Sequence, residues 1–141
     1  WQKPNPPPNV ACRYFTHSTE TIIWAAKNLK SKHKFNYKLM KEINKDKQMK
    51  DVWVMTAPGK SEKNYGKHPT QKPLSLLDRL ISAATDEGDL VLDAFNGSGT
   101  TGVSCIRTNR KYIGIELEKE FIELSKKRFA EQSKLNDDLF K

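Results

Sequence analysis

The chain has 141 residues, of which 30% are charged and 36% are hydrophobic, and its formal net charge is +8. This length suits one domain with a moderate core, and the excess of lysine and arginine favours an anionic partner, most often nucleic acid. We expect neither a signal peptide nor a membrane span, because the sequence has no apolar run long enough to cross a membrane. Its two cysteines, Cys12 and Cys105, show no metal-ligand or disulfide spacing, so we expect no metal site.

The first 26 residues combine a proline-rich opening with a short apolar run. Prolines at positions 4, 6, 7 and 8 remove backbone donors and exclude a helix there. The run at 20–26 predicts a short buried strand. The chain opens at Trp1 and its first methionine is Met40, so we expect a fragment, a processed chain or one piece of a split protein.

A basic stretch follows the predicted strand. Lysines crowd residues 27–50, with Phe35 and Tyr37 between them, and a second candidate strand lies at 51–55. Residues 57–71 are rich in glycine, lysine, proline and serine, which indicates a mobile loop.

Regular structure is expected from Pro73 onward. A proline suits the start of a helix, and Leu74, Leu77 and Ile81 then recur at helical spacing. Short apolar runs predict strands at 90–93 and 112–115. Periodic segments predict two more helices, at 100–107 and around 121–129, before a charged tail. This alternation of helix and strand is typical of a doubly wound α/β sheet.

The turn after the first of these strands satisfies the pattern G-x-G-x-x-G at residues 97–102, with Glu116 a suitable distance downstream. That pattern alone is also found in dinucleotide-binding enzymes, where a pyrophosphate lies on the helix N-terminus. Asp93, at the end of the strand, would repel a pyrophosphate but suits a cationic ligand. No lysine follows the second glycine, which argues against a nucleoside-triphosphate loop.

The run DAFNGSGTT at 93–101 resembles the S-adenosylmethionine (AdoMet) motif of amino-directed DNA methyltransferases. The preceding HPTQKPL at 68–74 looks like the segment of that family that closes over the methionine end of the cofactor. Its position before the glycine motif is typical of the beta arrangement, in which the catalytic half comes first. Residues 1–8 and 20–24 resemble the family's middle region, and the closest likeness is to adenine-N6 enzymes of restriction–modification systems.

The resemblance implies an α/β, Rossmann-like AdoMet-dependent methyltransferase fold that is partial and lacks the N-terminal catalytic portion. Residues 1–26 are expected to be the end of the catalytic half, and 27–67 a basic insertion with a target-recognition role. Residues 68–132 are expected to form the AdoMet-binding portion, and 133–141 a charged tail. The residues expected to bind the cofactor are His68, Thr70, Gln71, Lys72, Asp93, Phe95, Asn96, Gly97, Ser98, Gly99, Thr100 and Glu116.

No catalytic residue is expected in this chain. In the family an Asp or Asn, two prolines and an aromatic residue hold the flipped target base and its amine. The stretch Asn5-Pro6-Pro7-Pro8 lacks the aromatic residue, since Pro8 stands in its place. We therefore expect an adenine-N6 DNA methyltransferase whose cofactor-binding half alone binds AdoMet weakly and does not turn over. The alternatives are a cytosine-N4 enzyme, a truncated non-catalytic AdoMet- or DNA-binding module, and a nucleotide-dependent oxidoreductase.

The expected partners are double-stranded DNA and either a missing N-terminal portion or a partner chain that supplies the catalytic motif. A homodimer is a further candidate assembly. The resemblance implies a cytoplasmic protein of a prokaryote or phage. Lysines neutralise phosphates whatever the base sequence. The basic stretch therefore predicts either a solvated, partly mobile loop or a DNA contact made by Lys34, Lys38, Lys41 and Lys47.

Overall fold

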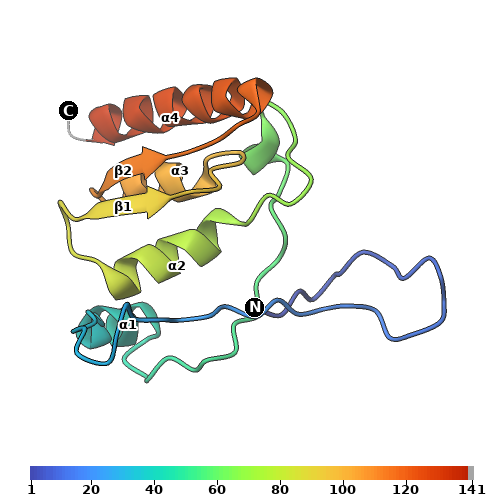
Figure 1. The fold of residues 1–141 in the computed structure, drawn as a ribbon, viewed down its shortest axis with the longest axis horizontal. Helices are drawn as coiled ribbons and strands as arrows, with labels where there is room; N and C mark the ends of the chain where they lie inside the picture. The colour runs from blue at the N-terminus through green and yellow to red at the C-terminus, as the bar shows by residue number, and fades with distance from the viewer. Residues whose placement is uncertain (140–141) are drawn as a thin grey trace.

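The computed structural model describes residues 1–139. In chain order the elements are α1 (Tyr37–Ile43), a 3-10 turn η1 (Ser61–Lys63), α2 (Leu74–Ala84), β1 (Leu90–Asp93), α3 (Thr100–Arg107), β2 (Lys111–Gly114) and α4 (Lys119–Leu139). Strands β1 and β2 form a two-stranded parallel sheet that lies between α4 and α2 in the view of Figure 1. No helix in this described part is both long and apolar enough to cross a membrane.

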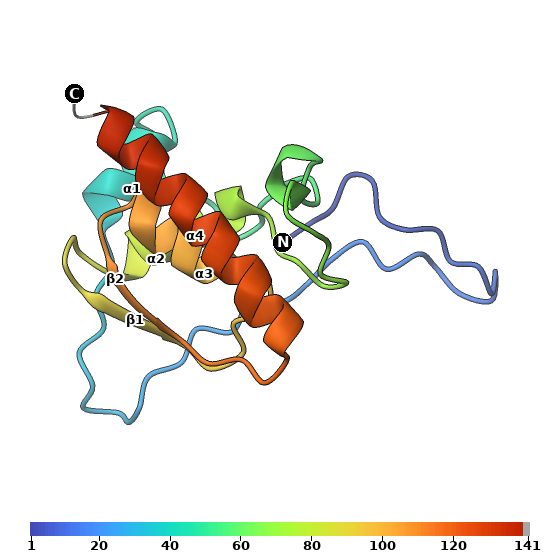
Figure 2. The ribbon, with the colours of Figure 1, turned by 90° about the horizontal axis from the view of Figure 1, so that it is seen from above.

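The two strands pair in parallel, and the connection between them runs through α3. The pairing places Leu92 opposite Ile113 and Asp93 opposite Gly114. Helix α3 packs against both α2 and α4 as well as against β2. Figure 2 shows these three helices gathered to one side of the strands. The β–α–β unit and its helix layer are those of a Rossmann-like α/β fold.

The core lies between the sheet and this helix layer. Leu76 and Ile81 from α2, Val103 and Cys105 from α3, and Leu124 from α4 are all buried. The hydroxyl of Ser104 donates a hydrogen bond of 2.6 Å to Oδ1 of Asp78, and this bond joins α3 to α2. Burial raises the pKa of the Cys105 thiol to about 11, so this thiol is a small, inert core group.

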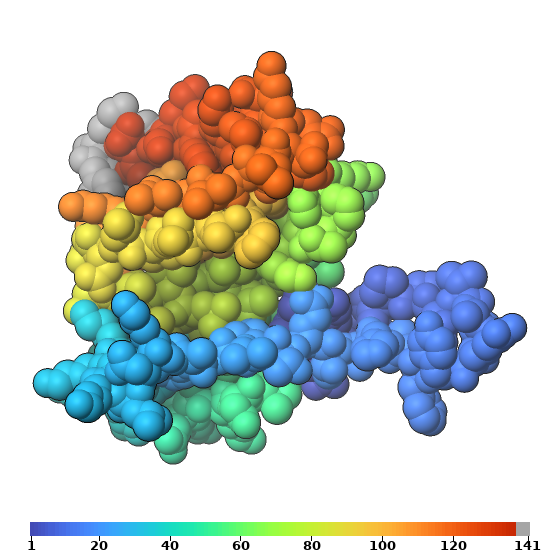
Figure 3. Space-filling model, viewed as in Figure 1, coloured from blue at the N-terminus to red at the C-terminus, as the bar shows by residue number. Residues whose placement is uncertain are grey.

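The opposite face of the sheet is bare within the described residues. Leu92 is 62% exposed and its partner Ile113 is 49% exposed, while Leu90 and Ile115 are exposed as well. Figure 3 shows atoms of both strands at the surface between the layers of α4 and α2. The sequence predicted a buried strand at 90–93, and the strand is present but is covered on only one face.

The strand predicted at 20–26 is absent, and so is the one at 51–55. Pairing in this region is limited to isolated bridges from Gln2 to Thr19 and to Val54. Ile23 is 85% exposed and Trp24 is 59% exposed, so the apolar run is not buried by this chain. A strand needs a continuous neighbour for its hydrogen bonds, and the described residues provide none at this position.

Trp1 anchors the opening segment, although the rest of that segment projects from the body as an irregular arm, drawn in blue in Figure 1. Its ammonium group donates to the carbonyl of Glu20 at 2.8 Å, and its indole Nε1 donates to the carbonyl of Met55 at 2.7 Å. These bonds bring three distant pieces of the sequence together beside α2.

The basic stretch contains a helix, α1, which was not predicted from the lysine-rich sequence. Met40 is buried against the body, and Nδ2 of Asn36 donates to the carbonyls of Ser82 and Thr85 at the end of α2, at 2.9 and 2.7 Å. Nη2 of Arg110 also donates to the Thr85 carbonyl, at 2.8 Å. This junction satisfies carbonyl groups that a helix end leaves without partners.

The helices and strands predicted after Pro73 are confirmed with small shifts. Helix α2 begins immediately after Pro73, the strand expected at 112–115 lies one residue earlier, and α3 has the expected bounds. Helix α4 continues to Leu139, through most of the predicted charged tail, while residues 140–141 lie outside the described part.

Candidate functional site

The turn between β1 and α3 is formed by two glycines in left-handed backbone conformations. Gly97 has φ +51° and Gly99 has φ +75°, values that residues with a Cβ rarely adopt. Gly99 also has no room for a side chain, because a Cβ there would lie 2.6 Å from Cβ of Ser125 and 2.8 Å from the ring of Phe129. The glycines therefore let α4 pack directly against the loop.

Asp93 holds the start of this loop with both carboxylate oxygens. Its Oδ1 accepts the backbone N–H of Phe95 at 2.9 Å, and its Oδ2 accepts the hydroxyl of Thr101 at 2.6 Å. Because Thr101 lies in the first turn of α3, the carboxylate ties the strand end to the helix start. Phe95 itself extends outward and is 90% exposed.

Glu116 holds the loop from the end of the neighbouring strand. Its Oε2 accepts the backbone N–H of Gly97 at 2.7 Å, and its Oε1 accepts those of Leu117 and Glu118 at 2.8 and 3.0 Å. The bonds from the N–H groups of Glu118, Gly97 and Leu117 hold the pKa of the Glu116 carboxyl below its usual value. The site thus contains an ionised carboxylate beside the glycine turn at neutral pH.

His68 lies over Gly97. A Cβ on Gly97 would approach Nε2 of His68 to 3.2 Å, and the imidazole packs edge-on against Phe121 with ring centroids 4.3 Å apart. The backbone N–H of Thr70 donates to Nδ1 of His68 at 3.2 Å, which orients the ring. The segment at 68–74, which resembles the family's cofactor-closing segment, therefore reaches the glycine loop through His68.

A pocket of about 170 Å³ opens between this segment and the loop. Ten of the twelve residues expected to bind the cofactor line it: His68, Thr70, Gln71, Lys72, Asp93, Phe95, Asn96, Gly97, Ser98 and Thr100. Of the other two, Glu116 binds the N–H of Gly97, and Gly99 faces α4. Pockets that enclose a ligand of drug size usually measure about 300–1,000 Å³, so this one covers only part of such a ligand.

Gln71 carries an unpartnered acceptor in this pocket wall. The residue is 8% exposed, and its Nε2 donates to the carbonyl of Glu62 at 2.8 Å. Its Oε1 is buried and has no hydrogen-bond partner. A buried acceptor without a partner is costly and indicates a place for a donor from a ligand or a water molecule.

Lys72 lies at the pocket edge but contacts a carboxylate of the chain. Its Nζ is 2.7 Å from Oε2 of Glu20, whose Oε1 is 2.5 Å from Nζ of Lys3. Burial of Glu20 opposes ionisation, but the two ammonium groups outweigh it and lower the pKa of the carboxyl. Both ammonium groups also lie over the ring of Trp1. Lys72 therefore joins the opening segment to the pocket wall.

Sequence reasoning missed two residues that support the loop. The hydroxyl of Tyr112, on β2, donates to Oδ1 of Asn96 at 2.7 Å, and burial raises the pKa of this tyrosine. Arg128, on α4, donates to Ser98 and Thr100. No signal in the sequence marked either residue for this role.

The lysines expected to contact DNA differ in their surroundings. Lys34 pairs with Asp86 and also lies 3.7 Å from Asp89, so its charge is neutralised within the chain. Lys38 and Lys41 are exposed on α1, and Lys47 is exposed beyond it.

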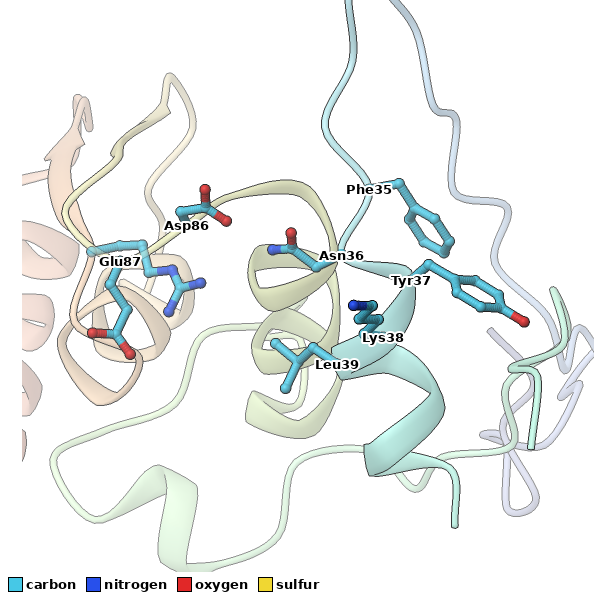
Figure 4. A pocket seen from close by; sticks show the side chains of 8 residues that line it. Phe35, Asn36, Tyr37, Lys38, Leu39, Asp86 and Glu87 are labelled. Atoms are coloured by element: carbon cyan, nitrogen blue, oxygen red, sulfur yellow. The ribbon is translucent and has the colours of Figure 1, made fainter. Parts of the chain in front are cut away.

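An open hollow of about 660 Å³ has one of these lysines, Lys38, in its lining (Figure 4). It is lined by Phe35, Asn36, Tyr37, Lys38, Leu39, Asp86, Glu87 and Arg110. Opposite charges lie on its rim, and it contains none of the residues around the glycine loop. Although this hollow is larger, the strand-end carboxylates and the unpartnered acceptor make the smaller pocket the better ligand site. No cluster of possible metal ligands occurs among the side chains that the structure describes, those of residues 1–137.

Two curated relatives resemble most of this chain. It is 60% identical over 131 residues to Type II methyltransferase M2.MboI of Moraxella bovis, a match that covers 93% of this chain and 48% of that protein. It is 58% identical over 137 residues to M2.DpnII of Streptococcus pneumoniae, covering 96% of this chain and 51% of that protein. The chain therefore spans about half the length of the curated relatives it matches.

Solved structures and a family model agree with these relatives. The structure of the M1.HpyAVI–SAM complex superposes with a TM-score of 0.72 at 40% identity, over 91% of this chain and 58% of that chain. The cytosine-N4-specific PvuII DNA methyltransferase superposes with a TM-score of 0.57 at 28% identity, over 68% of this chain and 36% of that one. The family model described as DNA methylase (N6_N4_Mtase) matches residues 1–127, and the chain therefore belongs to this DNA methylase family.

Proposed function

We propose that this chain binds S-adenosylmethionine at the glycine loop and is the cofactor-binding half of a DNA methyltransferase that acts on adenine N6. The observation that carries the proposal is the loop itself: Asp93 binds the N–H of Phe95, Glu116 binds the N–H of Gly97, and the imidazole of His68 lies over Gly97. The structural relative bound to SAM supports the choice of ligand.

The groups around the pocket fit AdoMet better than a dinucleotide. AdoMet supplies an electrophilic methyl group on a sulfonium, and it also carries an ammonium group, two ribose hydroxyls and no phosphate. The negative charge of Asp93 would repel a pyrophosphate but attracts a cationic ligand, while Glu116 offers acceptor oxygens for ribose hydroxyls. Oε1 of Gln71 offers a further acceptor for a donor such as the ammonium group.

The bare face of the sheet supports a role as one half of a larger enzyme. Leu92 and Ile113 present an apolar surface of the kind that a further layer of structure covers in α/β folds. We propose that the remaining part of the methylase packs on this face and provides the residues that hold the target amine. The chain alone then binds AdoMet weakly, because the small pocket encloses only part of the ligand, and it transfers no methyl group.

Identity among the relatives argues against cytosine N4 as the target, and the ground for adenine is the resemblance of the motifs to adenine-N6 enzymes. The match to the cytosine-N4 enzyme has 28% identity, whereas the Type II relatives named above have 58–60%. Base-resolved mapping of DNA modified by a full-length methylase that contains this half distinguishes the two targets. Methyl groups on cytosine N4 would contradict the proposed specificity.

Equilibrium dialysis with labelled AdoMet tests the cofactor assignment directly. We expect the wild-type chain to bind AdoMet in preference to NAD, and Asp93→Asn and Glu116→Gln each to weaken binding. Glu120→Gln, which removes an exposed carboxylate from the first turn of α4, is the matched control and should bind as the wild type does. Preference for NAD, or equal binding by all variants, would refute the assignment.

Methyl transfer to DNA tests the half-enzyme proposal separately. The chain alone should give no product, and activity should appear when the remaining part of a full-length relative is supplied. Appreciable transfer by the isolated chain would show that it carries its own catalytic residues. A chain that binds AdoMet but never becomes active with any complementing part would instead indicate a non-catalytic binding module.

A further inference from the structure

Arg128 is a buried guanidinium in the helix layer next to the glycine loop. The residue is 6% exposed, and Nη1 donates to the carbonyl of Ser98 at 2.6 Å, to the Ser98 hydroxyl at 3.0 Å and to the Thr100 hydroxyl at 3.1 Å. Among residues 1–137, whose side chains the structure describes, no carboxylate lies within ion-pairing distance of it. Burial lowers its pKa, and the more distant charges of Glu62 and Glu131 oppose this shift.

Burying a cation in the core without an ion pair is energetically unfavourable. Its desolvation is costly, and an apolar side chain of similar volume would pack there without that cost. Within residues 1–137, whose side chains are described, the hydrogen bonds of the Arg128 guanidinium all end on Ser98 and Thr100, which line the pocket. The position of the charge is therefore best explained by what it does to the loop.

The peptide between Ser98 and Gly99 is the group that Arg128 controls. Its carbonyl accepts from Arg128, and its N–H donates to the carbonyl of Asn96 at 2.8 Å. Gly97 and Gly99 flank Ser98 in left-handed conformations, and glycines leave a backbone free to rotate into other conformations. A hydrogen bond on each side of the same peptide plane prevents that rotation.

We propose that Arg128 is a positioning residue of the cofactor site, which holds the Ser98–Gly99 peptide in the orientation that receives AdoMet. This role rests on the proposed AdoMet function. The guanidinium acts through the loop and makes no contact with the ligand. Its effect is therefore on the affinity of the site and is the same for ligands that share the adenosyl group and the amino-acid end.

The test compares Arg128→Met and Arg128→Lys with Arg107→Met and Arg107→Lys in the whole chain. Arg107, on α3, forms an ion pair with Asp78, on α2, at 3.2 Å. Its replacement therefore removes an arginine ion pair without touching the loop. Binding of AdoMet and of S-adenosylhomocysteine is measured by equilibrium dialysis at concentrations up to millimolar. Melting temperature and amide hydrogen exchange at Gly99 are measured without ligand.

Arg128→Met should weaken binding of both ligands by the same factor, about tenfold or more, because the charge-assisted hydrogen bonds to the loop are removed. Exchange at the Gly99 amide should become faster. Arg128→Lys should recover part of the affinity, since an ammonium can still donate to the Ser98 carbonyl but lacks the planar fork. The Arg107 variants should keep wild-type affinity even where their melting temperature falls.

Affinity and Gly99 exchange unchanged in Arg128→Met would overturn the proposal, as would a loss of affinity matched by Arg107→Met. A loss confined to AdoMet would show that the charge acts on the ligand itself, which also overturns it. If Arg128→Met does not fold, Arg128→Lys against Arg107→Lys decides by the same criteria. If the wild-type chain binds neither ligand, both the proposed cofactor and this role of Arg128 are refuted. If the wild-type chain binds and the Arg128 variants bind equally well, only the role of Arg128 is refuted.

Discussion

The hydroxyl of Tyr112 donates a hydrogen bond of 2.7 Å to Oδ1 of Asn96, and so joins the middle of β2 to the residue that begins the glycine turn. Asn96 is 8% exposed, its backbone N–H donates to the carbonyl of Ile115 at 2.9 Å, and its Nδ2 donates to the carbonyl of Gly97 at 3.0 Å. The second strand therefore supports the turn as directly as the first.

Replacing Tyr112 with phenylalanine should destabilise the chain by about 1–3 kcal/mol, because the buried Asn96 oxygen loses its donor. Thermal unfolding measures this loss, and Tyr65→Phe, at a half-exposed tyrosine, is the control with little expected change. Burial also raises the pKa of Tyr112, so its phenol should titrate at a higher pH than free tyrosine does. Equal stability of the two variants would contradict the bond's importance.

Gly99→Ala should be more damaging than Gly88→Ala, although both glycines have a left-handed φ, +75° and +82°. At Gly88 nothing lies within 4 Å of a new Cβ, so only the conformational penalty of about 1–2 kcal/mol applies. At Gly99 the Cβ also collides with Ser125 and Phe129, which adds an overpacking cost of about 1–3 kcal/mol. Thermal unfolding of the two variants checks this order, which a similar loss in both would contradict.

Glu116 should make stability depend on pH in the acid range. Backbone N–H groups of Glu118, Gly97 and Leu117 lower its pKa in the folded chain, so its contribution is present above the unfolded pKa and is lost as pH falls through the folded pKa. Melting temperatures between about pH 3 and pH 7 should therefore fall less steeply on acidification in Glu116→Gln than in the wild type. Glu120→Gln should keep the wild-type slope, and an unchanged slope in Glu116→Gln would contradict this account.

The basic segment should contribute to DNA binding through α1 rather than through Lys34. Replacing Lys38, Lys41 and Lys47 with glutamine should reduce the slope of log K against log salt by about 0.9 for each DNA phosphate that the variant no longer neutralises. Lys34→Gln should affect stability more than this slope, because Lys34 already pairs with Asp86. Filter binding across a salt series measures both, and an unchanged slope in the triple variant would remove the DNA role of these lysines.

The bare sheet face should matter for assembly and not for the fold of the chain. Leu92→Lys with Ile113→Glu places opposite charges on paired, exposed positions, so the free energy of unfolding should change by no more than about 0.5 kcal/mol. Copurification with the remaining part of a full-length relative should be abolished. Leu135→Lys, at an exposed position of α4, should leave copurification intact. Equal copurification of the double variant would place the interface elsewhere.

Sequence periodicity predicted the second half of the chain well because its elements are local. The bounds of α3 and the positions of both strands follow from short apolar runs and a glycine turn that carry their own signals. The strand expected at 20–26 failed for a non-local reason, since Ile23 and Trp24 have the composition of a buried strand but no neighbouring strand within the described residues.

The residues of the candidate site also fall into those that the sequence could predict and those that it could not. Asp93 and Glu116 could be predicted because strand ends beside a glycine turn have a known geometry. The partner of Lys72 could not, since Glu20 is distant in sequence and reaches it only through the fold of the opening segment. Arg128 was equally hidden, because a basic residue on a charged helix carries no mark of burial until α4 is packed against the loop.

The Thr85 carbonyl, which accepts from both Asn36 and Arg110, has a consequence for how the chain unfolds. One oxygen links the segment before α1, the end of α2 and the entry to β2, so none of these can open without breaking a bond that serves the others. The basic segment should therefore melt together with the Rossmann-like unit in a single cooperative transition, where an appended loop would fray at lower temperature. Calorimetry and limited proteolysis should accordingly report one folding unit from α1 to α4.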